Sequence, residues 1–414
     1  MRIALVTNSY PPNLNGVSVA VKNLETALIA QNQEVFIITP RVPNVNYPKN
    51  VLAINSTPTP KTISQDLRFP IFDAKVQTFL RENQIQLVHS HDTIMGGLET
   101  VIAALEIGIP CLHTYHTLLE SYEYFKLPGY KQFIRSYSQI VCDSYDGVIA
   151  LSDKINNYLQ EIKVSTPIYK IPNIFLPPVI GNSIDPEIKN WIETNSLEQT
   201  FNILTFGRVA KEKNLESAIE ILAPLLHHYP NIRYIIAGDG PDLKNLKLLV
   251  EELGLEKQVI FSGAYQRHQI QTLCNYSKVF LNTSYSEVLP TTPLEAMYYS
   301  LPVVCVDDLA FNYLLKDGYN GYQAPIKSLS YFCEKLYLEP ALLATLSTQA
   351  KISADLVCSN NPIEKYLELY QFVIDQHIKS PEKDFLFYNI LKNLVLTQRN
   401  FNDLINNKLT RAHL

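Results

Sequence analysis

Two glutamates, Glu287 and Glu295, stand eight positions apart in the second half of the chain, and they are its strongest chemical signal. The apolar run at 278–282 is typical of a strand and places Glu287 in the loop that follows it. The letters TPLE at 292–295 predict a helix start, with Thr292 as the N-cap and Glu295 closing a capping box. A carboxylate at the carboxyl end of a strand, beside an exposed helix N-terminus, suits a polar anionic ligand. The simpler alternative is that Glu295 only caps its helix and Glu287 is a solvated loop residue.

Two cations follow another predicted strand, at 201–206. Arg208 comes almost directly after this strand, and Lys213 follows five residues later. A guanidinium fork and an ammonium group that emerge together can neutralise a diphosphate. The alternative for Lys213 is ordinary surface charge, because Lys211, Glu212 and Lys213 form a charged run that we expect to be solvated.

Two histidines, His113 and His116, lie at the end of a predicted strand at 109–113. Their spacing would allow both to bind a metal, but no Asp, Glu or Cys nearby completes an evident ligand set. A histidine at a strand end can instead donate a hydrogen bond to a substrate hydroxyl or carbonyl group. One of the two is expected to be a packed residue, and the spacing does not say which.

Two glycine-containing turns also follow predicted strands. Gly16 lies between the first strand and the first helix, where a glycine lets the backbone approach a phosphate or sugar. The turn at 237–242, AGDGPD, follows a strand as well, and a plain turn is as good a reading as ligand contact.

Composition limits the classes of function. A chain of 414 residues with 46% hydrophobic residues exceeds one ordinary core, which predicts two domains. The net charge of −5 gives no reason to expect a nucleic acid as partner. The six cysteines are scattered without a C-x-x-C pair, which indicates reduced thiols rather than a disulfide framework or zinc site. No apolar run is long enough to span a membrane, so we expect a cytoplasmic protein that meets any membrane from its surface.

The elements that position these residues alternate between short apolar runs and helical patterns, which predicts an α/β fold with doubly wound parallel sheets. The pattern lapses from 173 to 200, and we expect an interdomain connection there. We predict an N-terminal domain at 1–175, a second domain at 176–365, and helices at 366–414 that cross back to the first domain. Ligands of such domains bind at the carboxyl edges of the strands, so the cleft between two facing edges is the expected site.

Four segments in this order resemble the retaining glycosyltransferases of family 4, which have two facing Rossmann-like domains, the GT-B fold. They are SYPPNLNGVSVAVKNL, LTFGRVAKEKNLESAI, IIAGDGPDLKNLKLLVEELGLEKQVIFSGAYQ and SEVLPTTPLEAMYYSLPVV. The resemblance extends over roughly residues 1–375. It implies transfer of a hexose, with UDP-glucose favoured as donor, and no cofactor or metal.

The resemblance also implies roles for particular residues. Arg208 and Lys213 would bind the two phosphates, and Glu295 the ribose hydroxyls. Glu287 would lie against the donor sugar, with Gly16 and His116 approaching it from the first domain. The backbone at Ala264 and Tyr265 would meet the base. Most family members have a glycine where this chain has Pro290, so main-chain donation would have to come from neighbours such as Thr291 or Thr292.

The segment after His116 is where the resemblance implies that the acceptor is chosen. Its aromatic and basic residues suit an interfacial anchor, with these members singled out: Tyr122, Tyr124, Phe125, Lys126, Lys131 and Arg135. The alternative is a helix core face, comprising Phe133, Ile134, Tyr137, Ile140 and Val141. The letters HTYHTLLESYEYF resemble the diacylglycerol glucosyltransferases, which implies a membrane lipid acceptor. A soluble glycan, metabolite or protein acceptor remains an alternative, as does a catalytically silent protein that binds nucleotide sugars.

Overall fold

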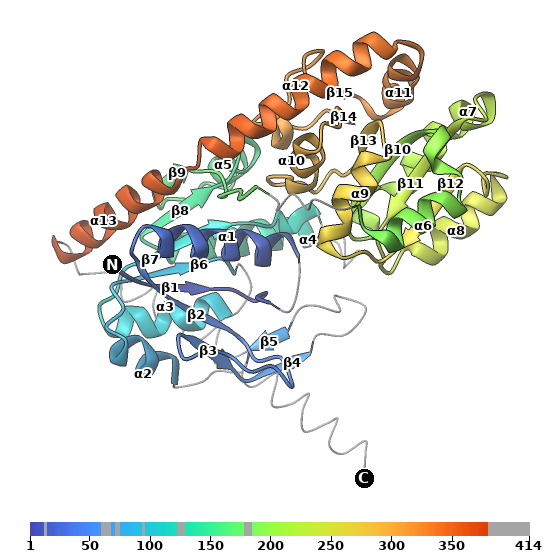
Figure 1. The fold of residues 1–414 in the computed structure, drawn as a ribbon. Coiled ribbons are helices and arrows are strands. Elements are labelled where there is room, and N and C mark those ends of the chain that lie inside the picture. Colours follow the sequence, from blue (N-terminus) through green and yellow to red (C-terminus); the bar gives the residue numbers. More distant parts are fainter. Residues whose placement is uncertain are drawn as a thin grey trace. The chain divides into compact units, whose positions relative to one another are not determined.

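A computed structural model describes residues 1–11, 15–58, 68–70, 75–92, 96–121, 129–177 and 184–379 of the chain (Figure 1). The chain divides into two compact units. The first unit is Met1–Ile174 together with the segment from Asn361 onward, and the second unit is Phe175–Asn360.

The described part of the first unit contains a parallel sheet of seven strands in the order β3-β2-β1-β6-β7-β8-β9. The strands are β1 (Arg2–Val6), β2 (Glu34–Pro40), β3 (Val51–Ile54), β6 (Leu87–Ser90), β7 (Cys111–Tyr115), β8 (Gly147–Ala150) and β9 (Ile168–Lys170). Two short strands, β4 (Ser56–Pro58) and β5 (Arg68–Pro70), pair separately and antiparallel. The central strands are buried along their length, as expected for apolar strands covered on both faces.

Helices cover this sheet. They are α1 (Gly16–Ala30), α2 (Lys75–Glu82), α3 (Gly96–Glu106), α4 (Tyr130–Asp143) and α5 (Asp153–Glu161). In Figure 1, α1 lies on one side of the sheet and the α2–α3 pair on the other. Val76 of α2 and Val101 of α3 pack in one buried cluster with Ala4 of β1, which joins the two helices to the sheet.

The last described helix, α13 (Ile363–Lys379), also belongs to the first unit. Tyr366 donates a hydrogen bond from its hydroxyl to the carbonyl oxygen of Pro172 at 3.2 Å. His377 approaches Asp146 at 3.6 Å. The first unit is therefore built from both ends of the described chain.

The described part of the second unit contains a parallel sheet of six strands in the order β12-β11-β10-β13-β14-β15. The strands are β10 (Phe201–Phe206), β11 (Ile232–Ala237), β12 (Val259–Gly263), β13 (Val279–Asn282), β14 (Val303–Val306) and β15 (Gly321–Ala324). The helices are α6 (Pro186–Thr194), α7 (Leu215–His228), α8 (Leu243–Glu252), α9 (Ile270–Asn275), α10 (Thr291–Tyr298), α11 (Leu329–Leu338) and α12 (Pro340–Ser359).

Each sheet has one point at which the strand order reverses. In the first unit it lies between β1 and β6, and in the second between β10 and β13. Loops at such a switch point diverge and leave a crevice at the carboxyl edge of the sheet, where ligands of this architecture bind. The loops after β1, β6, β10 and β13 are therefore the expected positions of the functional residues.

The predicted α/β class with two parallel sheets is confirmed. The predicted connection at 173–200 was wrong in one respect, because it contains α6. Asp185 caps α6 by accepting a hydrogen bond from the Ile188 amide at 2.9 Å, and Pro186 is its first residue. Of the helices predicted at 366–414, the structure describes only the part within α13, which ends at Lys379, and the rest lies outside the described residues. Among the described helices, none has the length and apolarity needed to cross a membrane.

Candidate active site

Hydrogen bonds join the two loops at the switch point of the second unit, the β10 loop (residues 207–214) and the β13 loop (residues 283–290). The buried hydroxyl of Thr283 lies 3.0 Å from the carbonyl oxygens of both Lys213 and Asn214. The Ser284 hydroxyl donates to the carbonyl oxygen of Glu212 at 3.1 Å. Asn214 has a positive φ of 53°, a conformation that asparagine tolerates better than most residues. Together these contacts hold the turn that carries Lys213 against the end of β13.

Two ion pairs lie on these joined loops. Nζ of Lys213 is 2.7 Å from Oε1 of Glu287, and the Arg208 guanidinium contacts the carboxylate of Glu212. The cationic side chains are 33% and 40% exposed, whereas each carboxylate side chain is only 12% exposed. Arg208, Lys213 and Glu287 thus lie on adjoining loops, as their positions after strands predicted. The expectation that Glu212 is solvated was wrong, because its carboxylate is largely buried beside Arg208.

The capping-box prediction for Glu295 was wrong. Helix α10 begins at Thr291 with Pro290 as its N-cap, and no side chain caps it. The fixed φ of Pro290, −69°, with an extended ψ of 120°, suits the residue just outside a helix, so the helix starts two residues earlier than predicted. Thr291 and Thr292 consequently lie in the first turn, where the main-chain amides of a helix lack intrahelical partners.

Glu295 instead occupies the buried side of α10. Its nearest charged partner is Arg267, at 3.8 Å, and its Oε1 accepts no hydrogen bond from the residues that the structure describes. Burial raises the pKa of Glu295, and the Arg267 charge partly offsets this. A buried carboxylate oxygen without a donor is suited to accept hydrogen bonds from a ligand hydroxyl.

Tyr265 lies close to this carboxylate. Burial and the Glu295 charge both raise the pKa of the Tyr265 hydroxyl, and its ring contacts Phe206 edge-on at 6.2 Å. Ala264, just before it, is exposed. Tyr313 was not predicted: its hydroxyl donates to the carbonyl oxygen of Pro290 at 2.7 Å and fixes the entry to α10.

The AGDGPD turn has a structural role. A Cβ on Gly238 would lie 1.9 Å from the carbonyl oxygen of Gly207, and one on Gly240 would lie 2.2 Å from that of Val209. The Val209 amide donates to Asp239 O at 2.9 Å. The two glycines therefore allow the turn to pack directly against the start of the β10 loop.

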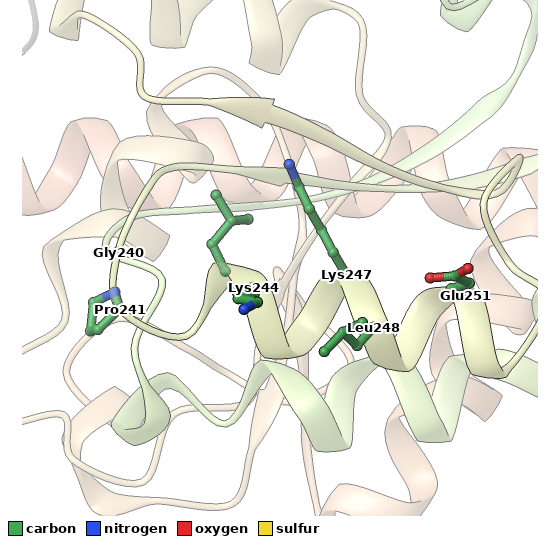
Figure 2. A pocket seen from close by; sticks show the side chains of 7 residues that line it. Gly240, Pro241, Lys244, Lys247, Leu248 and Glu251 are labelled. Atoms are coloured by element: carbon green, nitrogen blue, oxygen red, sulfur yellow. The ribbon is translucent and has the colours of Figure 1, made fainter.

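A surface hollow of about 470 Å³ begins at this turn and extends over α8 (Figure 2). Its lining comprises Gly240, Pro241, Leu243, Lys244, Lys247, Leu248 and Glu251. None of the charged residues of the β10 and β13 loops lines it, so we assign it no part in the candidate site.

The first unit gathers four histidines at the carboxyl edge of its sheet. His91 Nδ1 lies 2.8 Å from His116 Nε2, and the rings of His89 and His91 have centroids 4.1 Å apart. His113 is fully buried and stacks on Tyr145, so it is the packed member of the predicted pair. His116 is partly exposed and is the one available to a ligand. His89 and His91 were not predicted, although the letters HSHD at 89–92 lie at the end of a short apolar run.

These histidines are neutral at physiological pH. Burial lowers the pKa of His116 to about 3 and that of His113 to about 4. Burial also holds the pKa of His89 and His91 well below the usual value, and neighbouring histidines add to the effect. His116 can therefore act as a neutral hydrogen-bonding group but not as a cation.

Helix α13 fixes the back of this histidine group. The Tyr370 hydroxyl lies 2.6 Å from His89 Nδ1, and the Thr114 hydroxyl lies 2.7 Å from His89 Nε2. Tyr370 is fully buried. Both ring nitrogens of His89 are thus paired, which fixes the orientation of the ring that lies against His91.

Gly16 is the first residue of α1 and is exposed. A Cβ built on it would meet no atom of the described residues within 4 Å. Asn15 and Ser18 form a capping box at this helix start, at 3.0 and 2.8 Å. At the same switch point Asn8 donates to Asp92 at 2.6 Å, which joins the loop after β1 to the loop after β6.

Helix α4 carries much of the described part of the predicted acceptor segment. Lys131 is exposed, and Phe133 is 67% exposed, so the predicted core face holds for buried Val141 but not for Phe133. Arg135 is bound by two carboxylates, Glu120 and Glu161, each at 2.7 Å. The charge of Arg135 is therefore balanced by carboxylates of the same unit. Tyr122, Tyr124, Phe125 and Lys126 lie outside the described residues.

Within the described ranges, no group of three or more His, Cys, Asp or Glu side chains is arranged to hold a metal ion. The histidine group is held instead by hydrogen bonds and ring contacts.

The chain matches two family models in tandem. Residues 14–175 match "Glycosyltransferase Family 4", and residues 187–338 match "Glycosyl transferases group 1". Among curated proteins, the alpha-monoglucosyldiacylglycerol synthase of Streptococcus pneumoniae is 28% identical over 334 residues, covering 78% of this chain and 74% of the relative. The enzyme of the same name from Acholeplasma laidlawii is 27% identical over 405 residues, covering 92% of this chain and 100% of the relative.

The fold has solved relatives. The Anabaena protein HepE, determined in complex with UDP-glucose, superposes with a TM-score of 0.68 at 19% identity, over 89% of this chain and 99% of that one. The fold is thus that of the GT-B proteins, as predicted. Both family models, their order along the chain and the curated relatives agree: the chain is a glycosyltransferase in which a Family 4 domain is followed by a group 1 domain.

Proposed function

We propose that the protein transfers glucose from UDP-glucose to the free hydroxyl of diacylglycerol, with retention of configuration and without a metal ion. The curated relatives supply the substrate class, because both are named alpha-monoglucosyldiacylglycerol synthase. The observation that carries the chemistry is the Lys213–Glu287 pair at the switch point of the second unit. It places a cation and a carboxylate in direct contact on two adjoining loops.

The donor would be held by the second unit. Arg208 and Lys213 contact the diphosphate, and the amides of the first turn of α10 face the same anion. Glu295 accepts hydrogen bonds from the ribose hydroxyls through its unpaired oxygen. The exposed backbone at Ala264 and the ring of Tyr265 adjoin that carboxylate and would meet the base.

The transfer itself breaks the bond between the sugar's anomeric carbon and the phosphate oxygen. The acceptor hydroxyl oxygen forms the new bond to that carbon, and its proton passes to the departing diphosphate. Negative charge grows on the leaving group as the bond breaks, so Arg208 and Lys213 stabilise the transition state more than the bound donor. Glu287 holds Lys213 through their ion pair, and its carboxylate would stabilise positive charge on the sugar.

The acceptor would be met by the first unit. His116 is neutral and serves as a hydrogen-bond partner for a sugar hydroxyl, and Gly16 leaves the start of α1 open. The exposed Phe133 and Lys131 on α4 suit contact with the surface of an anionic membrane. An apolar acceptor such as diacylglycerol is presented only at such a surface.

A single assay tests the proposal. The protein is incubated with labelled UDP-glucose and vesicles of dioleoylglycerol in anionic phospholipid, with and without EDTA. We expect a lipid-soluble product with an alpha linkage by NMR, formed at the same rate when EDTA is present. A beta product would contradict retention, and loss of activity in EDTA would contradict metal independence. Transfer only to soluble sugars would show that the acceptor is not diacylglycerol. If no UDP-, GDP- or ADP-sugar were turned over, the proposed activity would be overturned.

A further inference from the structure

The proposed diphosphate site contains one carboxylate that the proposed chemistry does not use. Glu287 is proposed to lie beside the donor sugar. Glu212, in contrast, contacts the Arg208 guanidinium and has no proposed role. Its side chain is only 12% exposed, so the charge is poorly screened by water. The two cations of the site are thus balanced by two carboxylates before any ligand arrives.

The main chain of Glu212 is anchored by a hydrogen bond. Ser284, which is 1% exposed, donates from its hydroxyl to Glu212 O at 3.1 Å. The Ser284 amide in turn donates to the side chain of Asn282 at 2.9 Å, at the end of β13. The backbone of the turn that carries Glu212 is therefore fixed to the end of β13, and from there the Glu212 carboxylate contacts Arg208.

A fixed carboxylate at this position has two effects on an incoming diphosphate. It repels the phosphate charges directly, and it occupies part of the Arg208 fork that would otherwise face the phosphate. Both effects weaken binding of the nucleotide diphosphate, and both therefore also weaken binding of the UDP product. Release of product limits the turnover of many enzymes, and in an enzyme of that kind weaker binding of UDP speeds turnover.

We propose that Glu212 sets the affinity of the site for the nucleotide diphosphate by partly neutralising Arg208, and so limits how tightly the UDP product is held. The inference rests on the proposed function, because it assumes that Arg208 contacts a diphosphate. It adds an affinity-determining residue that acts through Arg208 and need not touch the sugar.

The test is the affinity of UDP for charge-removing variants, measured by calorimetry. Glu212→Gln removes the charge but keeps the shape of the side chain and an oxygen that can accept a hydrogen bond from Arg208. Glu212→Ala removes both the charge and that oxygen. We expect both to lower the Kd of UDP, by about 5- to 20-fold for Gln, from the loss of one nearby like charge. Glu212→Asp keeps the charge and should stay close to the unsubstituted protein. Glu220→Gln is the matched control, because it removes an exposed charge farther along α7.

Phosphate charge separates this effect from a change in shape. The gain in affinity should be largest for UDP, smaller for UMP and absent for uridine, and it should shrink as KCl is added. Unchanged or weaker UDP binding in a variant that melts like the unsubstituted protein would overturn the inference. So would an equal gain for uridine. Failure of the unsubstituted protein to bind UDP would instead overturn the assumed donor, and the inference with it.

Discussion

Lys213 and Glu287 stand 74 positions apart in the sequence, yet their side chains form a 2.7 Å ion pair at the carboxyl edge of the second sheet. The pair exists because β10 and β13 are neighbours, so the loops that follow them emerge together. It joins the cation proposed for the diphosphate to the carboxylate proposed for the sugar.

Lys213→Ala and Glu287→Gln are each expected to lower kcat by roughly 10²- to 10³-fold, the usual cost of losing one charge-stabilising group. The measurement is turnover of UDP-glucose with diacylglycerol vesicles, after circular dichroism has verified folding. Lys211→Ala is the control, because Lys211 is exposed on the same turn. Rates near the unsubstituted value in either site variant would contradict the assignment.

Tyr370→Phe is expected to destabilise the first unit by about 1–3 kcal/mol, because it leaves a buried ring nitrogen of His89 without its partner. Hydrogen exchange of the β6 amides measures this locally. Tyr331→Phe removes a hydroxyl from a side chain that is 58% exposed and should have little effect. If the exchange of β6 stayed the same in Tyr370→Phe, the link between α13 and the histidine group would not contribute to stability.

Acidification should destabilise the protein between pH 6.5 and about pH 4. The folded-state pKa values of His113 and His116 are about 4 and 3, below the unfolded value, so in this window the unfolded chain binds more protons. Each such histidine removes up to about 1.4 kcal/mol of stability per pH unit as the pH falls below 6.5.

Urea unfolding at several pH values measures that slope. His116→Gln should reduce it, whereas His227→Gln, which changes an exposed residue, should not. A stability that is flat from pH 7 to 5 would show that these histidines are not held neutral.

Phe133→Ser is expected to weaken flotation with anionic vesicles severalfold, because it removes an exposed aromatic ring from α4. Leu248→Ser on α8 is the control, since Leu248 is 55% exposed and belongs to the second unit. Equal flotation of the two variants would remove Phe133 from the proposed membrane contact.

Most strands could be predicted from the sequence, because continuous apolar runs such as 201–206 have few other uses in an α/β protein. Strand β15 was missed. Its first residue is Gly321, where a Cβ would lie 2.2 Å from the carbonyl oxygen of Val303. The glycine allows two strands to approach closely, but in the sequence a glycine at this position predicts a turn.

The charged residues of the site were predictable by position, and their pairing was not. Arg208, Lys213 and Glu287 each follow a strand, which is enough to place them at one edge of a sheet. Whether Glu212 points to solvent or to Arg208 depends on side-chain direction within a short turn, which the spacing of charges does not encode. Likewise, Glu295 fits a capping box by spacing, but Pro290 starts the helix early and turns the carboxylate inward.

The place of α13 in the first unit has a consequence for how this protein is made. A ribosome releases β6 and its histidines early, but Tyr370 emerges only after the whole second unit has been synthesised. Until then the nascent N-terminal sheet lacks a helix, and the ring of His89 lacks the hydroxyl that completes its pairing. Truncation within α13 would therefore remove contacts from the first half of the polypeptide, far in sequence from the truncated end.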